Sequence, residues 1–206
     1  LLIFISSCSS NIYNKFDDPI LVKNILEVND SIVKKDPVNL LIQPSPVNKF
    51  LRYPLGLAIN NLANDNPEEK FRIWLEKNEN RSNRLEKLIS NKQIDQLKSY
   101  NNSFNDFLKN IGQEPIIIND IDIKKNIERL KRFYDSKGYF DSNITYDSII
   151  ASNQLTAKYS VETNERYLID SITVNIESKD LDSLYKVNIS QSRIKKGEFF
   201  TIDKLV

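Results

Sequence analysis

The chain has no histidine and no methionine, a single cysteine and only four glycines among its 206 residues. It therefore has no imidazole base, no histidine-ligated metal site and no internal disulfide. Four glycines are too few for the phosphate-cradling loops of nucleotide-binding folds. Lys and Arg number 29 against 28 Asp and Glu, so the net charge is only +1. Because nucleic-acid binding depends on clustered cations, we expect no nucleic-acid partner and a protein partner instead.

Two pairs of carboxylates are the candidates for catalysis or metal binding. Asp120 with Asp122, and Asp180 with Asp182, could act as acid and base or hold a metal ion. Each pair falls at an expected helix cap or turn, where carboxylates have local roles. We predict no catalytic residue, no metal, no cofactor and a protein that is not an enzyme.

The N-terminus carries a candidate lipidation site. Residues 1–7 are an apolar run that closes on two serines, which is typical of the end of a secretory signal peptide. Ile5-Ser6-Ser7-Cys8 resembles a bacterial lipobox, in which the thiol is the nucleophile that acquires lipid. We expect residues 8–17 to form a spacer anchored through Cys8, since two or more acyl chains anchor stably. The alternative is a buried strand with an ordinary cysteine.

Hydrophobic periodicity predicts the elements of the remaining chain. Residues 20–29 read as a strand that ends in an Asn-Asp turn, and prolines then punctuate an irregular stretch up to residue 54. Residues 55–112 read as mostly helical. The expected signals there are Asn66 as a cap before Pro67, a helix beginning near Leu85, Leu88 and Ile89, a further cap at Ser103, and Gly112 as the stop. We expect the apolar side chains of these helices to face inward, namely Phe71, Trp74, Leu75, Phe104, Phe107, Leu108 and Ile111.

In the next segment, the spacing of apolar residues changes clearly from that of a helix to that of a strand. Asn119 or Asp120 caps a helix, Gly138 ends it, and one apolar stripe runs along it at Ile123, Ile127, Leu130 and Tyr134. A two-stranded hairpin is expected to come next, turning at residues 152–154, with Leu155, Ala157, Tyr159 and Val161 inward. A new strand over 167–176, a turn over 195–200 and a helix capped by Thr201 complete the chain. The predicted class is α+β, with helices on one face of a small mixed sheet.

Two segments resemble a known family. Residues 130–141, LKRFYDSKGYFD, resemble the helix-to-strand junction of POTRA domains, the periplasmic modules of the BamA/TamA superfamily of outer-membrane assembly factors. Residues 195–205, KKGEFFTIDKL, resemble the entry to a following module. Together with the lipobox, residues 43–46, 54–57 and 112–116, and residues 167–172, they are most similar to the lipid-anchored TamL type of Bacteroidota.

The resemblance implies tandem β-α-α-β-β modules. The first would span 18–163 with a helical insert at about 55–112, and a truncated second would span 164–206. Family members end in a β-barrel, so we expect the chain to be part of a longer protein. The implied partners are unfolded outer-membrane protein clients, other subunits of the assembly machinery, and the outer membrane itself. Because no acidic run follows Cys8, the modules are expected to face the periplasm.

An edge strand would supply the binding site. A client strand can add to unpaired backbone groups without its side chains being read. The residues expected to pair are Tyr139, Phe140, Asp141, Ser142, Asn143, Ile144, Thr145 and Tyr146, with Asp141, Asn143 and Thr145 outward. In one alternative, this hairpin only holds its module together. In another, the chain is a periplasmic or surface lipoprotein scaffold that binds one fixed partner in a secretion complex.

Overall fold

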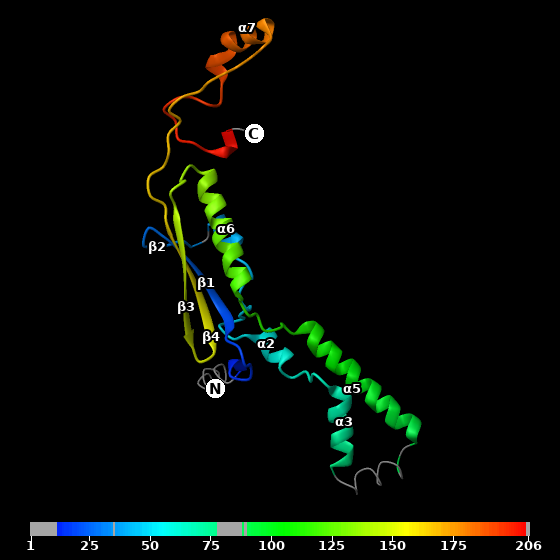
Figure 1. The fold of residues 1–206 in the computed structure, drawn as a ribbon. Coiled ribbons are helices and arrows are strands. Elements are labelled where there is room, and N and C mark those ends of the chain that lie inside the picture. The colour runs from blue at the N-terminus through cyan, green and yellow to red at the C-terminus, as the bar shows by residue number, and fades with distance from the viewer. Residues whose placement is uncertain (1–11, 35, 78–87, 89, 205–206) are drawn as a thin grey trace. The chain divides into compact units, whose positions relative to one another are not determined.

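The structure, a computed structural model, describes residues 12–34, 36–77, 88 and 90–204. Cys8 and the expected signal-peptide residues 1–7 lie outside this range. Four strands form one sheet in the order β2-β1-β4-β3. They are β1 (Ile20–Val28), β2 (Ser31–Ile32), β3 (Asn143–Ala151) and β4 (Gln154–Glu162) (Figure 1). The predicted α+β class is confirmed.

Two tight turns join neighbouring strands of the sheet, one between β1 and β2 and the other between β3 and β4. Asn29 and Asp30 have φ of 46° and 62°, and Ser152 and Asn153 have φ of 49° and 59°. Positive φ at both central residues is the type I′ turn, whose twist suits a hairpin. Ile20 N–H donates to the Asn153 carbonyl at 3.0 Å, where β1 and β4 begin, and Asn29 N–H donates to the carbonyl of Val161 at 2.9 Å, where they end. These two strands therefore run parallel, and the sheet is mixed.

The chain divides into two compact units, each described by itself. The first comprises residues 1–23, 46–117 and 150–155, and contains α2 (Leu55–Asn60), α3 (Pro67–Glu76) and α5 (Asn91–Ile111). Its core is a cluster of apolar side chains contributed by Ile12, Tyr13, Ile20, Val47 and Leu57. The mostly helical character of residues 55–112 is confirmed where the chain is described, and Asn66 precedes Pro67 at the start of α3 as expected.

The predicted cap at Ser103 is wrong. Helix α5 runs unbroken through this residue and begins after Ser90, whose N–H donates to the Gln93 side-chain oxygen at 2.8 Å. Ser103 lies on an exposed face, where a serine is tolerated inside a helix. Leu85 and Ile89, expected to begin another helix, lie outside the described residues. Gly112 does end the helix, with extended rather than left-handed backbone.

The inward placement of several aromatic side chains is also wrong. Trp74 is 48% exposed, against the core position expected of it, and its ring stacks on Phe71 at 5.8 Å between centroids. Phe104, Phe107 and Ile111 are exposed as well, while Leu108 is half-buried. Helical spacing therefore predicted correctly which side chains share a face of each helix, but it did not predict whether that face is buried.

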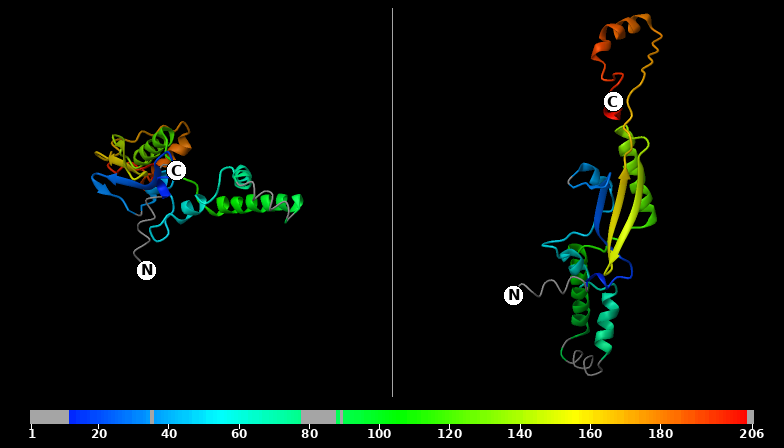
Figure 2. Two further views of the ribbon diagram at one scale, coloured as in Figure 1. Left: turned by 90° about the horizontal axis from the view of Figure 1, so that it is seen from below. Right: turned by 90° about the vertical axis from the view of Figure 1, so that its left-hand side faces the viewer.

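The second unit comprises residues 24–45, 118–149 and 156–206. In it, α6 (Asp120–Ser136) lies along one face of the sheet (Figures 1 and 2). The Asn119 cap is confirmed, because its side-chain oxygen accepts the N–H of Asp122 at 2.9 Å. Leu130 and Tyr134 of the predicted stripe are buried, as are Ala157, Tyr159 and Val161 of β4. The apolar stripe and the alternating strand thus form one core.

One buried amide ties three elements of this core together. Asn126 is fully buried on α6, and its side chain pairs with the backbone of Gln43, donating to the carbonyl at 2.6 Å and accepting the N–H at 3.0 Å. Its amide nitrogen also donates to the Tyr159 hydroxyl at 2.8 Å. Burial raises the pKa of Tyr159, so the phenol stays neutral and can accept this bond. Helix, irregular segment and strand therefore share one hydrogen-bonded group.

The expected strand over 167–176 does not form. Within the described chain, backbone pairing there is confined to residues 167–169, which form one antiparallel bridge, Leu168 with Phe199, and hydrogen bonds to Gly138 and to residues 197–200. An extended segment without flanking strands lacks the partners that make a strand stable. Helix α7 (Lys179–Asn188) and the short 3₁₀ helices η2 (Ile189–Gln191) and η3 (Ile202–Lys204) come next, the last in place of the helix expected after Thr201. None of the helices described here is long and apolar enough to cross a bilayer.

Replacing Asn126 tests the role of the buried amide. We expect Asn126→Ala to lower the free energy of unfolding by about 2–4 kcal/mol, because the Gln43 backbone groups and the Tyr159 hydroxyl lose their partner together. Tyr159→Phe removes only one of these bonds and should cost about 1 kcal/mol. Urea denaturation followed by circular dichroism measures both. Equal losses in the two variants would contradict the shared role.

Candidate functional site: the edge strand and the Gly138 junction

Strand β3 lies at one edge of the sheet, and no described segment pairs with its outer side. Its register with β4 follows from the two-residue loop and is marked by Tyr146 and Tyr159, whose ring centroids lie 5.2 Å apart. The residues next to a two-residue loop exchange hydrogen bonds, and such pairs then alternate along the hairpin. The backbone groups of Ile144, Tyr146, Ser148 and Ile150 therefore face the open side.

One of these outward donors is already engaged. The Ser148 N–H donates to the carboxylate of its neighbour Asp147 at 2.8 Å. A side chain that bonds a neighbouring N–H competes with any strand that would pair there. Charged residues on edge strands are a common means of limiting unwanted pairing. The open edge is thus interrupted near its middle.

The side chains of β3 differ between its two halves. Ile144 and Tyr146 are half-buried, and burial raises the pKa of Tyr146, so they belong to the core. Asn143 and Thr145 point the other way and are exposed, which confirms the predicted alternation. Further along, the polar pattern gives way to exposed isoleucines, Ile149 and Ile150.

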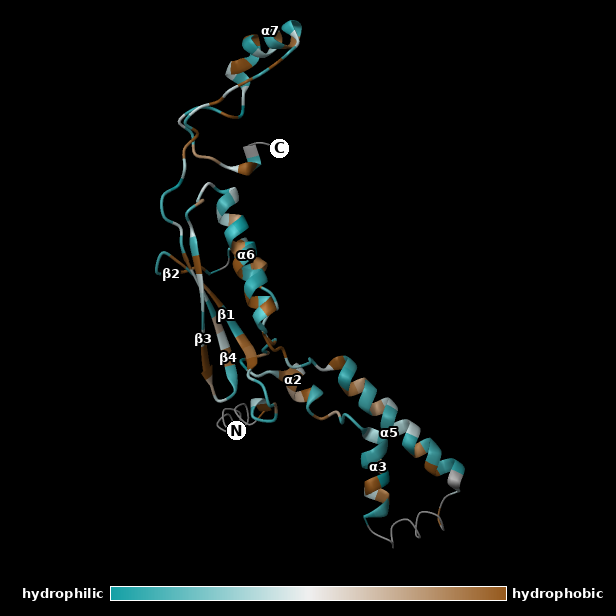
Figure 3. Ribbon diagram, in the orientation of Figure 1, coloured by the Kyte–Doolittle hydropathy of each residue, from teal (hydrophilic) through white to brown (hydrophobic). Residues whose placement is uncertain are grey.

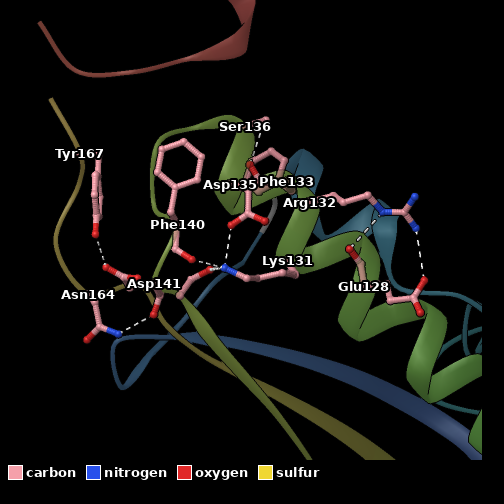
Figure 4. Close-up of polar contacts among 11 residues, drawn as sticks. Glu128, Lys131, Arg132, Phe133, Asp135, Ser136, Phe140, Asp141, Asn164 and Tyr167 are labelled. Atoms are coloured by element: carbon pink, nitrogen blue, oxygen red, sulfur yellow. Dashed lines mark hydrogen bonds and ion pairs between the residues drawn. The ribbon is translucent and has the colours of Figure 1, made fainter. Parts of the chain in front are cut away.

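The first four residues expected to pair with a client are not in the strand. Tyr139, Phe140, Asp141 and Ser142 form the turn between α6 and β3, which begins at Asn143. Lys131 fixes this turn from α6, because its ammonium group bonds the Asp135 carboxylate at 2.7 Å and the Phe140 carbonyl (Figure 4). The same group also lies 3.4 Å from the Ser142 hydroxyl. The turn therefore has a defined conformation and does not present the row of backbone groups that an added strand would pair with.

Asp141 also holds this turn in place. It was expected among the outward-facing residues of the edge strand. Its carboxylate instead accepts the Tyr167 hydroxyl at 2.7 Å, and its carbonyl accepts the Asn164 side chain at 2.8 Å (Figure 4). The hydrogen bond to this carboxylate raises the pKa of Tyr167. The turn is thereby tied to the segment that follows β4.

Two further chain segments meet at Gly138. Its φ is +90°, and a Cβ added there would lie 2.7 Å from the Phe200 carbonyl oxygen. Its own carbonyl accepts the N–H of Tyr167 at 2.8 Å, and the Tyr167 carbonyl accepts the N–H of Phe200 at 3.0 Å. The two motifs that resemble POTRA segments, 130–141 and 195–205, therefore contact each other in space. We call this contact, formed by residues 137–141, 164–169 and 197–203, the Gly138 junction.

Aromatic and cationic side chains complete the Gly138 junction. The Phe140 ring centroid lies 5.4 Å from that of Tyr167 and 5.1 Å from that of Phe200. The Arg166 guanidinium lies 4.7 Å from the centroid of the Phe199 ring and donates to the Lys137 carbonyl at 2.7 Å. Sequence reasoning missed Arg166, although a cation between two aromatic motifs is a signal for stacking.

The carboxylate pairs have local partners. Asp122 belongs to the capping box of α6, and Asp182 pairs with Lys186 at 2.6 Å within α7. No group of three or more potential metal ligands occurs in the part of the chain that the structure describes.

Alanine substitutions at two glycines isolate the close approach at the Gly138 junction. Gly197 also has positive φ, +80°, but nothing lies within 4 Å of an added Cβ. Gly197→Ala should cost only the backbone term of about 1–2 kcal/mol. Gly138→Ala should cost about 2–5 kcal/mol, because overpacking adds to it. Urea denaturation measures the difference, and limited proteolysis should show faster cleavage within 164–204 only in Gly138→Ala. Equal losses would contradict the contact.

Scans of this chain against protein-family models, curated proteins and solved structures each returned no match.

Proposed function

We propose that this chain is the periplasmic POTRA portion of an outer-membrane protein assembly or translocation factor, of the BamA/TamA superfamily and closest to its lipid-anchored TamL type. It would bind unfolded client strands or partner subunits by β-augmentation and deliver them to a C-terminal barrel outside this sequence. The observation that carries the proposal is the position of β3 at the edge of the sheet.

The chemistry of the edge suits this role. Backbone groups at Ile144, Tyr146 and Ile150 face the open side, and a paired backbone recognises extended chain regardless of its sequence. The nine residues of β3, at about 3.4 Å each, form an edge about 30 Å long that is interrupted at Ser148. The exposed isoleucines Ile149 and Ile150 add apolar surface for clients whose strands alternate polar and apolar residues.

The Gly138 junction supports the tandem arrangement in this proposal. A segment that resembles the entry to a second module packs on the helix-to-strand turn of the first through Gly138, Phe140 and Phe200. Lys137 and Asp203 add an ion pair at 2.6 Å between the same two segments. A connection held in this way orients the next module, whereas a Gly/Ser linker would not.

A scaffold that binds one fixed partner is the second candidate. Asp147 favours the scaffold, because its carboxylate occupies the Ser148 N–H and so removes one backbone donor that client strands would use. A fixed partner strand could leave that donor unpaired. The coding sequence beyond Val206 separates the candidates: a β-barrel supports assembly, and a stop codon supports the scaffold.

Site-specific photocrosslinking in cells tests client binding. A photoreactive residue at Asn143 or Thr145, on the exposed face of the edge strand, should yield adducts with outer-membrane proteins. Glu128 is the matched control, since it is an exposed position on α6. Adducts in equal yield from Glu128 would contradict pairing at β3. A single adduct of constant mass would favour the scaffold.

The same experiment reports on Asp147. We expect Asp147→Ala to increase adduct yield from Thr145 severalfold, because the freed Ser148 N–H adds one ladder bond of about 0.5–1.5 kcal/mol. Asp147→Asn keeps a side-chain acceptor and should resemble the unsubstituted protein. An unchanged yield in Asp147→Ala would show that this carboxylate does not restrict the edge.

Lipid attachment at Cys8 is part of the proposal and has its own test. In a form that ends at Val206, and so lacks the proposed barrel, Cys8→Ser should abolish palmitate incorporation and release the protein from the outer-membrane fraction, because serine does not replace the thiol as nucleophile. Metabolic labelling and membrane fractionation measure both. Ser9→Ala is the matched control and should change neither. Labelling that persists in Cys8→Ser would exclude the anchor.

A further inference from the structure

Helix α5 carries an apolar stripe that no described segment covers. Brown segments recur along this helix in Figure 3. The stripe consists of Leu97, Tyr100, Phe104, Phe107 and Ile111, which are 45%, 72%, 61%, 54% and 50% exposed. Large aromatic side chains exposed together on one helix face are typical of an interaction site.

The spacing of the stripe specifies a helical partner. Its residues recur at intervals of three and four, which is the alternation of the a and d positions of a heptad. Two helices that share such a seam interlock their side chains along it. The stripe spans fifteen of the 21 residues of α5, about two heptads. A partner helix therefore fits this surface better than a strand or a small ligand.

Contacts with α3 and its preceding loop use a different face of α5. Asn105 exchanges hydrogen bonds with the backbone of Asn64, Asn101 donates to the Pro67 carbonyl, and Lys98 lies 3.4 Å from the Glu68 carboxylate. These side chains project about 80–140° around the helix from the centre of the stripe, at 100° per residue. Packing against α3 therefore leaves the stripe available.

The residues that flank the stripe favour a second copy of this chain. On the side away from α3 the flank is uncharged, consisting of Gln96, Ser103 and Asn110. Two identical helices can approach along such a flank without like-charge repulsion. Binding to an anionic membrane surface would instead require Lys or Arg beside the apolar face.

The order of residue types is also self-complementary. Read from either end, the stripe is aliphatic, three aromatics, aliphatic. An antiparallel copy related by a two-fold axis would therefore place rings near rings, as an isologous interface requires. Half of five side chains of about 150–200 Å² is about 400–500 Å² per copy, or about 800–1,000 Å² in total. That area is at the lower limit for a specific interface.

We propose that α5 is a self-association surface, through which two copies of this chain pair antiparallel along the stripe. The interface is weak, in the micromolar range, as its small area implies. The proposal does not depend on client binding at β3, and a failure of either leaves the other intact.

Sedimentation of the full 206-residue chain tests this proposal. We expect a concentration-dependent shift from 24.0 kDa toward twice that mass as the concentration rises to about 500 µM. Phe104→Glu should raise the dissociation constant about thirtyfold or more, because it places a charge at the centre of the seam. Tyr100→Glu, at the most exposed stripe position, is a second variant that should also weaken pairing without disturbing the fold.

Ser99→Glu is the matched control, since it adds the same charge to an exposed, polar face of α5. It should associate like the unsubstituted chain, and circular dichroism should show unchanged helix content in all variants. A monomer at every concentration would overturn the proposal. So would a dimer that persists in both stripe variants, equal loss in Ser99→Glu, or a monomer that binds neutral vesicles through the stripe.

Discussion

The second unit depends on the satisfaction of one buried amide. Asn126 lies on the face of α6 that covers the sheet, at a position where an apolar residue would continue the stripe. Burying an amide is costly unless its hydrogen bonds are made, so the chain must bring Gln43 and Tyr159 to it. This requirement fixes the irregular segment before residue 46 against helix and strand. It thereby also sets the position of β4, and of β3 beside it.

Much of this arrangement is encoded locally. The Asn119 cap, the stripe of α6, Gly138 and the hairpin over 143–162 could be predicted because each depends on residues a few positions apart. Asn126 could not, since its partners are distant in the sequence and its own residue type suggests exposure. The Gly138 junction likewise joins segments about 60 residues apart, although each contributing motif was visible by itself.

The errors have a common origin. Periodicity tells which residues share a face, but not what the face meets. The aromatic side chains of α5 were expected inside and lie outside, and the alternating residues of 167–176 lack the neighbouring strands that would make them a ladder. For the site, the edge position of β3 agreed with expectation, whereas its first four residues belong to a turn. Lys131 and Asp141, which hold that turn, are ordinary charged residues with no sequence signal.

The anchoring of that turn has a mechanical consequence. β3 begins where Lys131 grips the Phe140 carbonyl and where Asp141 holds Tyr167. Traction along β3 therefore loads the helix and the segment after β4 at the same time, because these bonds act in parallel with the hairpin ladder. A force applied to β3 would therefore reach residues 164–169 directly through the hydrogen bond between Asp141 and Tyr167.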